Sequence, residues 1–113
     1  MSPRRNEPDA TPWEGLKGLD KLLEHRTRLG ICVLLSRGHS LSFSRLKSLL
    51  EETDGSLGAH LRKLEDDGYL TVRREFQDRK PVSWYALTPA GRRALKTHLG
   101  VLAGVVKGSA SAR

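Results

Sequence analysis

One face of the segment 54–67 combines small, hydroxyl-bearing and basic side chains at helical spacing. With about 100° of rotation per residue, Leu57, Leu61 and Leu64 share one side, which must face a core. The opposite side is small and uncharged near the start and basic one and two turns later. The side chains that begin the segment, face outward or lie on its flank are Asp54, Gly55, Ser56, Ala59, His60, Arg62 and Lys63.

This arrangement suits a helix that lies in the major groove of double-stranded DNA. Small side chains allow close approach, Ser and Arg can reach base edges, and Lys can reach a phosphate. The positive end of the helix dipole adds attraction for a phosphate. An ordinary amphipathic helix with a solvated outer face stays an open alternative. The acidic run 65–67 should point away from DNA.

Further basic residues lie in the segments on either side of this helix. Alternating apolar and polar residues predict two strands around 70–73 and 84–87, and the polar residues 75–81 between them predict a hairpin with a charged tip. The hairpin carries Arg73, Arg74, Arg79 and Lys80, and the preceding helix carries Ser44, Arg45, Lys47 and Ser48. We expect these side chains to contact the DNA backbone, which positions a protein without reading sequence.

The composition agrees with a polyanionic partner. The 113 residues include 20 Lys+Arg and 13 Asp+Glu, and the net charge of +7 is spread over the middle and end of the chain. A basic globular domain suggests a polyanionic partner, most often nucleic acid, and a solvated surface that is basic without such a partner stays an open alternative. With 37% apolar and 29% charged residues, the chain is too apolar for full disorder and too charged for a membrane protein. Polar residues 1–10 do not resemble a secretory signal, and the single cysteine indicates a reducing, cytoplasmic setting.

The elements that must position these residues follow in the order helix, helix, short strand, helix, helix, strand, strand, helix. This is the plan of a winged helix-turn-helix, an α+β fold that is mostly helical. The helices before the reading segment are predicted over 14–24, over 26–36 and from Ser42 or Ser44 to Glu51-Glu52, with a short strand at 40–42. We expect a disordered tail over 1–12, one domain over 13–107 (helix-turn-helix about 42–67, wing about 69–87, C-terminal helix about 89–106) and a flexible tail over 108–113.

Local signals predict where these helices begin, end and pack. Ser42 or Ser44 should cap the third helix and Thr53 or Asp54 the fourth, and Thr88-Pro89 should begin the last. Gly38 and Gly68 should end the second and fourth helices. Gly30 inside a helix marks the close approach of another helix. The third helix should turn inward Phe43, Leu46, Leu49 and Leu50.

Four stretches together resemble a known family. They are 53–65 (TDGSLGAHLRKLE), 68–70 (GYL), 79–81 (RKP) and 85–91 (YALTPAG). They are similar to small prokaryotic winged helix DNA-binding domains related to the MarR and ArsR regulators, over about residues 19–96. The resemblance implies a cytoplasmic, nucleoid-associated transcriptional regulator, usually a homodimer formed through its terminal helices. Gly58, Ala59 and Asp78 differ from the residues that the family often has, which leaves the operator sequence and the wing conformation open.

The last helix has more apolar surface than one small domain can cover. With the first helix it could build a shared bundle across a two-fold axis. The candidate dimerisation residues are Leu16, Leu19, Leu23, Leu95, Leu99, Leu102 and Val106. Such a homodimer would place two reading helices about 34 Å apart, to match a palindromic operator with half-sites one helical turn apart. We expect it to repress transcription by blocking polymerase.

Other kinds of site are not indicated. There is no phosphate-binding loop, nucleophile elbow or paired-carboxylate cleft, so we predict neither an enzyme nor a cofactor. Metal sensing is not favoured because the Cys and His residues lack close ligand spacing; they are His25, Cys32, His39, His60 and His98. Cys32 should be a small buried hydrophobe, His98 a surface or interface residue, and Trp84 should lie on the outer face of the wing.

Two other kinds of partner stay open. The same fold could serve as a protein-interaction module without sequence-specific DNA binding. RNA binding is less favoured, because aromatic residues are only 5% of the chain and RNA recognition relies on exposed aromatic side chains for base stacking. A small-molecule effector also stays open, and nothing in the sequence indicates its identity.

Overall fold

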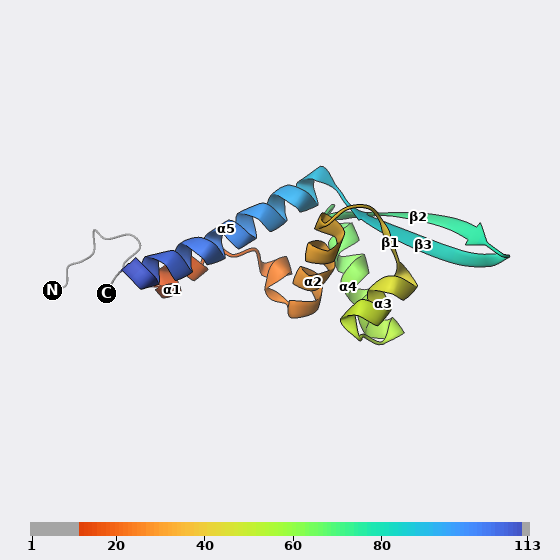
Figure 1. Cartoon of the computed structure of the whole chain (residues 1–113), viewed down its shortest axis with the longest axis horizontal. Coiled ribbons are helices and arrows are strands. Elements are labelled where there is room, and N and C mark those ends of the chain that lie inside the picture. The colour runs from red at the N-terminus through yellow and green to blue at the C-terminus, as the bar shows by residue number, and fades with distance from the viewer. Residues whose placement is uncertain (1–11, 112–113) are drawn as a thin grey trace.

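The computed structural model describes residues 12–111 and shows an elongated molecule measuring 68 × 25 × 21 Å (Figure 1). A hairpin projects from one end of the helical body, and a long C-terminal helix leaves it on the other side. The described elements are α1 (Pro12–Leu16), the 3₁₀ helix η2 (Lys21–Glu24), α2 (Arg26–Ser36), β1 (Leu41–Ser42), α3 (Phe43–Leu50), α4 (Asp54–Asp66), β2 (Leu70–Gln77), β3 (Lys80–Leu87) and α5 (Pro89–Ser111). This order confirms the predicted α+β, mostly helical fold.

The three strands form one antiparallel sheet in the order β1-β3-β2. β2 and β3 pair along their whole length, from Leu70 opposite Leu87 to Gln77 opposite Lys80. The ladder therefore includes most of 75–81, which the sequence predicts as a turn. Only Asp78 and Arg79 form the turn, both with positive φ of 50° and 68°. Polar residues continue the strands because cross-strand backbone hydrogen bonds need no apolar side chain.

Leucines from several helices fill the core under the sheet. Leu57, Leu61 and Leu64 of α4 are fully or almost fully buried, which confirms the predicted inward side of this helix. Gly30 in α2 lies against α3, since a Cβ there would come within 3.0 Å of Leu50 Cδ2. Cys32 is buried as predicted, and burial raises the pKa of its thiol to about 12.

The N-terminal region differs from the single helix predicted over 14–24. It is divided into α1 and η2 by a turn at Lys17 and Gly18. Asp20 adopts an extended conformation and its Oδ1 accepts the Leu22 amide at 2.9 Å, so it caps η2 instead of continuing a helix. Asp is well suited to such a cap, because its short side chain competes for nearby backbone amides. The predicted tail 1–12 overlaps α1 at Pro12 and otherwise lies outside the described residues.

Three other details of the sequence prediction are wrong. The last helix continues to Ser111, beyond the predicted end at about 106, so much of the predicted flexible tail is helical. Leu49 is 42% exposed and does not face inward with Leu46. α2 ends at Ser36 with Arg37 as its C-cap, next to the predicted end at Arg37-Gly38, but of the glycines in the described region only Gly68 has a positive φ, so Gly38 is no left-handed cap. None of the helices in the described range is long and apolar enough to cross a membrane.

Candidate nucleic-acid interface

α3 and α4 form a tight helix-turn-helix with a cap on each helix. Ser42 Oγ accepts the Arg45 amide at 3.1 Å, and Thr53 Oγ1 accepts the Ser56 amide at 3.2 Å. Between the helices, Glu51 takes a left-handed conformation with φ of 53° and ends α3. These caps satisfy amides that a helix start leaves without partners. They fix the direction in which α4 leaves the turn.

The outer side of α4 is exposed to solvent as predicted. Asp54, Gly55, Ala59, Arg62 and Lys63 are exposed, and Ser56 is half-buried. In the part of the chain that the structure describes, neither Arg62 nor Lys63 takes part in an ion pair. The acidic residues at positions 65–67 stand at the far end of the helix, next to β2. The small start and the basic middle of α4 are therefore free to meet an anionic surface.

His60 lies apart from this exposed surface. It is half-buried and turned toward the start of α2, where its Nδ1 is 3.2 Å from the Arg28 guanidinium and its ring is 4.2 Å from that of His25. Burial, with smaller contributions from the positive charges of His25 and Arg28, lowers the pKa of His60. The structure thus gives His60 an internal packing role between α2 and α4.

Glu52 joins the same contact between α2 and the helix-turn-helix. Its Oε2 accepts a hydrogen bond of 2.6 Å from the Thr27 hydroxyl, and this bond is the main reason that the pKa of Glu52 is lowered. A second hydrogen bond, from Ser56, acts in the same direction. The start of α4 is therefore tied to α2 on its inner side.

The wing residues divide between the two faces of the hairpin. Because side chains alternate along a strand and Arg74 is opposite Ser83, Arg74 lies on the face of buried Tyr85, whereas Arg73 lies on the other face. Arg73 Nε donates to Glu75 Oε2 at 2.9 Å and is thereby partly neutralised. Arg79 in the turn and Lys80 beside it are exposed, and no salt bridge within the described region involves them.

Tyr85 marks where α4 and the wing come together. Burial raises the pKa of its hydroxyl, and the positive charges of Arg74 on β2 and Arg62 on α4 oppose this effect. Tyr85 also belongs to the buried cluster that contains Leu57, Leu61 and Leu64 of α4, so the Tyr85 face of the hairpin is the one that packs toward α4. The structure brings the basic part of α4 and one face of the wing to the same side of the sheet, although 12 positions separate Arg62 from Arg74 in the sequence.

The basic residues of α3 are less uniform than predicted. Ser44, Arg45 and Ser48 are exposed. Lys47 Nζ instead forms a 2.9 Å ion pair with Asp54 Oδ1 at the start of α4. Such an exposed pair contributes little stability, but it compensates the charge of Lys47 and places a carboxylate at the beginning of the reading helix.

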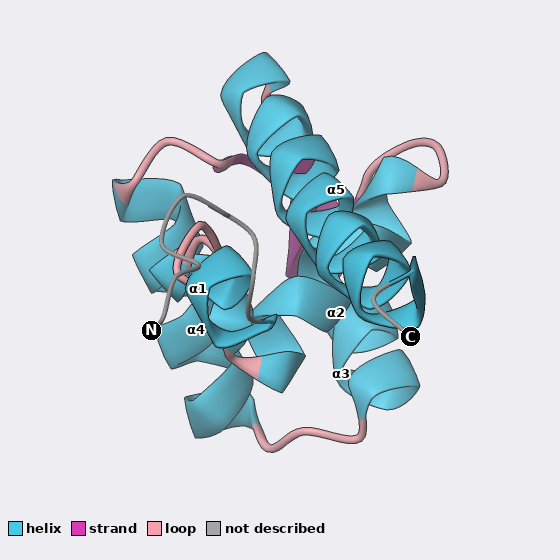
Figure 2. Cartoon of the chain, turned by 90° about the vertical axis from the view of Figure 1, so that its left-hand side faces the viewer, coloured by secondary structure: helices cyan, strands magenta, loops and turns pink. Residues whose placement is uncertain are grey.

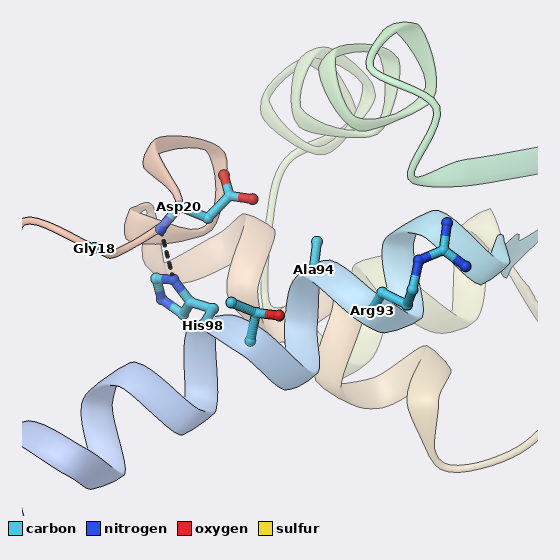
Figure 3. A pocket seen from close by; sticks show the side chains of 6 residues that line it. Gly18, Asp20, Arg93, Ala94 and His98 are labelled. Atoms are coloured by element: carbon cyan, nitrogen blue, oxygen red, sulfur yellow. Dashed lines mark hydrogen bonds between the residues drawn. The ribbon is translucent and has the colours of Figure 1, made fainter.

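Sequence reasoning missed a polar connection between α5 and the base of the wing. The Asp20 amide donates to His98 Nδ1 at 3.1 Å (Figure 3), and the Tyr69 hydroxyl donates to Asp20 Oδ2 at 2.5 Å. His98 is only 2% exposed, so its predicted surface position is wrong. The hydrogen bond to Asp20 raises the pKa of Tyr69 to about 12. A pocket of about 480 Å³ lies beside this connection and is lined by Gly18, Asp20, Arg93, Ala94, Thr97 and His98.

The terminal helices lie side by side within one chain (Figure 2). Gly15 of α1 approaches α5 closely, since a Cβ there would come within 2.7 Å of Val105 Cγ2. Two candidate dimerisation residues are in the core of the single chain: Leu23 is 0% and Leu95 4% exposed, so neither is free for a partner. Five keep exposed or half-buried apolar surface: Leu16, Leu19, Leu99, Leu102 and Val106. Trp13 of α1 is also exposed, at 68%.

Two aromatic side chains of the wing, Phe76 and Trp84, lie in different environments. Phe76 near the tip is 75% exposed, a feature that the sequence analysis did not single out. Trp84 is opposite Arg73 and Ser42, on the face away from Tyr85 as predicted. Its indole N–H is buried without a hydrogen-bond partner among the described residues. The same part of the chain has no group of three or more Cys, His, Asp or Glu residues arranged to hold a metal ion.

Comparison with known proteins decides the family. A family model described as "Winged helix DNA-binding domain" matches residues 27–106, which include the helix-turn-helix, the wing and most of α5. The chain belongs to this winged helix DNA-binding domain family. This winged helix protein is 30% identical to an uncharacterized protein of Methanocaldococcus jannaschii. The match covers 70% of this chain and 86% of the relative.

Two solved structures carry the similarity further. A transcriptional regulator homologue from Pyrococcus horikoshii superposes with a TM-score of 0.77 and 28% identity, over 86% of this winged helix chain and 95% of the other. PadR of Bacillus subtilis, solved in complex with operator DNA, gives a TM-score of 0.60 and 27% identity, over 66% of this chain and 48% of PadR.

Proposed function

We propose that this winged helix protein binds double-stranded DNA in a sequence-specific manner and regulates transcription. α4 lies in the major groove, where Arg62 contacts a base edge and Lys63 a phosphate. Arg74, Arg79 and Lys80 of the wing contact the neighbouring backbone. The observation that carries this proposal is that Arg62 and Lys63 on the outer side of α4 and Arg74 on the hairpin face that packs toward α4 are all exposed. The operator complex of PadR supports DNA as the partner class.

The two ends of α4 have different roles in this proposal. Gly55, Ser56 and Ala59 permit close approach of the helix to the groove, and Ala59 can contact a thymine methyl. Ser44 and Arg45 of α3 lie against the backbone and set the register. His60 and Lys47 do not contribute directly, because His60 packs on α2 and Lys47 pairs with Asp54.

We further propose that the protein acts as a homodimer formed by α1 and α5. The apolar residues left open on these helices support this, with Leu99 42% and Val106 67% exposed at positions that lie beyond the core. α5 also extends far from the body, so two copies could pair along it (Figure 1). A two-fold dimer would match a palindromic operator with half-sites about 34 Å apart. Binding there would repress by excluding polymerase, without catalysis.

Selection of bound duplexes from a random pool tests the DNA partner and the symmetry together. A palindromic consensus is the expected result, and failure to enrich any sequence would contradict specific binding. On the selected site, Arg62→Ala should weaken binding by about 1–3 kcal/mol and relax the preference at one base pair. Arg79→Ala should weaken all sequences alike and reduce the salt slope by about 0.9. Lys21→Ala is the matched control, because Lys21 is exposed on η2, away from the wing.

Two measurements separate this proposal from a protein-interaction module. A DNA-binding protein should be retained on random DNA at low salt and released by about 0.2–0.5 M salt. An interaction module should show no such retention. Sedimentation at micromolar concentration tests the homodimer, and a clean species at the monomer mass of 12.6 kDa would refute it.

A further inference from the structure

Phe76 is a large apolar side chain that the protein leaves in water at the outer part of the wing. It is 75% exposed, and the cross-strand partner Pro81 is exposed as well. The ring is two residues from the turn formed by Asp78 and Arg79. The Phe76 ring is not needed to hold β2 and β3 together, because their backbone pairing continues past it to Gln77. The ring is therefore available for a contact outside the chain.

The direction of Phe76 follows from the register of the hairpin. Side chains two positions apart on a strand lie on the same face, so Phe76 shares its face with Arg74 and Val72. Phe76 and Arg74 are opposite Pro81 and Ser83, and these two share the face of Tyr85. Tyr85 packs in the buried cluster that contains Leu57, Leu61 and Leu64 of α4. Phe76 therefore lies on the α4 side of the wing, further out than Arg74.

The surroundings of Phe76 favour an anionic partner that also has apolar surface. Exposed Arg74, Arg79 and Lys80 lie within four positions of it. These cations outnumber the two nearby carboxylates, exposed Asp78 and half-buried Glu75, the latter of which pairs with Arg73. A second wing placed on this face would bring like charges together, whereas double-stranded DNA brings phosphates to the cations. The apolar parts of a duplex that lie next to the phosphates are the deoxyribose edges that line the minor groove, the same groove in which other DNA-binding proteins insert Phe, Leu or Pro between base steps.

From this geometry we infer that Phe76 packs against deoxyribose in the minor groove beside the major-groove segment that α4 reads. The inference rests on the proposed DNA-binding function. It assigns to Phe76 the part of the DNA affinity of the wing that does not depend on salt concentration. Contacts by Arg79 or Lys80 release counterions and weaken as salt rises. Burial of an apolar ring releases no counterion, so its contribution should be the same at low and high salt.

The test compares Phe76→Ala with Gln77→Ala on the selected duplex. Gln77 is exposed, adjacent in sequence and on the opposite face of β2, so it is the matched control. Phe76→Ala should bind about tenfold more weakly at every salt concentration, with an unchanged salt slope. Hydroxyl-radical footprinting, which reports access to deoxyribose, should show loss of protection at the flanking minor groove only. Phe76→Leu should keep part of the affinity, and circular dichroism should confirm that each variant is folded.

Three results would overturn the inference. If Phe76→Ala binds and protects the duplex like Gln77→Ala, the ring does not contact DNA. If Phe76→Ala changes the salt slope as Arg79→Ala does, the effect is electrostatic. If Phe76→Ala alters the sedimentation of the free protein, the ring packs on a second copy. In these three cases the wild type still binds DNA, whereas a wild type that fails to bind any duplex removes the proposed function as well.

Discussion

The turn of the wing provides a prediction in which stability and DNA binding change in opposite directions. Asp78 and Arg79 both have positive φ, 50° and 68°, as in a type I′ hairpin turn. Asp tolerates this left-handed region, whereas for other residues with a Cβ it costs about 1–2 kcal/mol. Glycine has no such cost. Arg79→Gly should therefore relieve strain at the tip and remove a cation at the same time.

The expected gain is small because glycine also increases the freedom of the unfolded chain. That effect is about 0.5–1 kcal/mol, so the net stabilisation should be about 0.5–1 kcal/mol, or a few degrees in Tm. Urea and thermal unfolding followed by circular dichroism measure it. Arg79→Lys is the control, since it keeps both the strain and the charge and should match the wild type.

The same variants report on DNA. Arg79→Gly should lower the slope of log affinity against log salt by about 0.9, the amount expected for one lost phosphate contact, while Arg79→Lys should keep the slope. An Arg79→Gly protein no more stable than Arg79→Lys would refute the argument from backbone strain. Equal salt slopes for the two variants would refute the phosphate contact.

Three further perturbations test other parts of the structure. Gly91→Ala should destabilise by about 1–3 kcal/mol in urea unfolding, because its Cβ would come within 2.3 Å of the Tyr69 carbonyl oxygen. Asp20→Ala should cost about 1–2 kcal/mol through the lost cap and hydrogen bonds, and ultraviolet titration should show the pKa of Tyr69 falling from about 12 toward its ordinary value of 10.0. Because burial and neighbouring cations lower the pKa of His60 below its ordinary value of 6.5, the unfolded chain takes up the proton first. Stability should therefore fall as the pH drops below about 6.5, and His60→Gln should make the urea midpoints at pH 7 and pH 5 more nearly equal.

The pocket formed by α5 and the loop after α1 lies next to a series of hydrogen bonds that connects two regions for which different functions are proposed. His98 belongs to α5, Asp20 to the loop before η2, and Tyr69 to the start of the wing. Because the Asp20 amide donates to His98 and the Asp20 carboxylate accepts from the Tyr69 hydroxyl, a movement of α5 at His98 would shift Asp20 and with it the hydrogen bond of Tyr69. This arrangement joins the helix proposed for dimerisation to the segment that follows the reading helix.

The sequence alone was sufficient for features that depend on near neighbours in the chain. The inward side of α4 and the glycine at its end, Gly68, were predicted correctly, and the observed caps Ser42 and Thr53 are each one of the two candidates that the sequence offered. Helical periodicity, capping and glycine at a helix end act within a few residues, so the local sequence determines them. The order of elements followed from these signals, whereas the family was indicated by the resemblance of four sequence stretches.

Only the tertiary structure decided which apolar and polar residues meet from distant parts of the chain. Leu23 and Leu95 have the same pattern as Leu99 and Val106, yet the first two are in the core and the others face solvent. His98 finds its partner 78 positions away at Asp20. A periodic pattern shows that a helix has an apolar side, but the packing of the whole chain determines how much of that side is covered and what remains exposed for a partner.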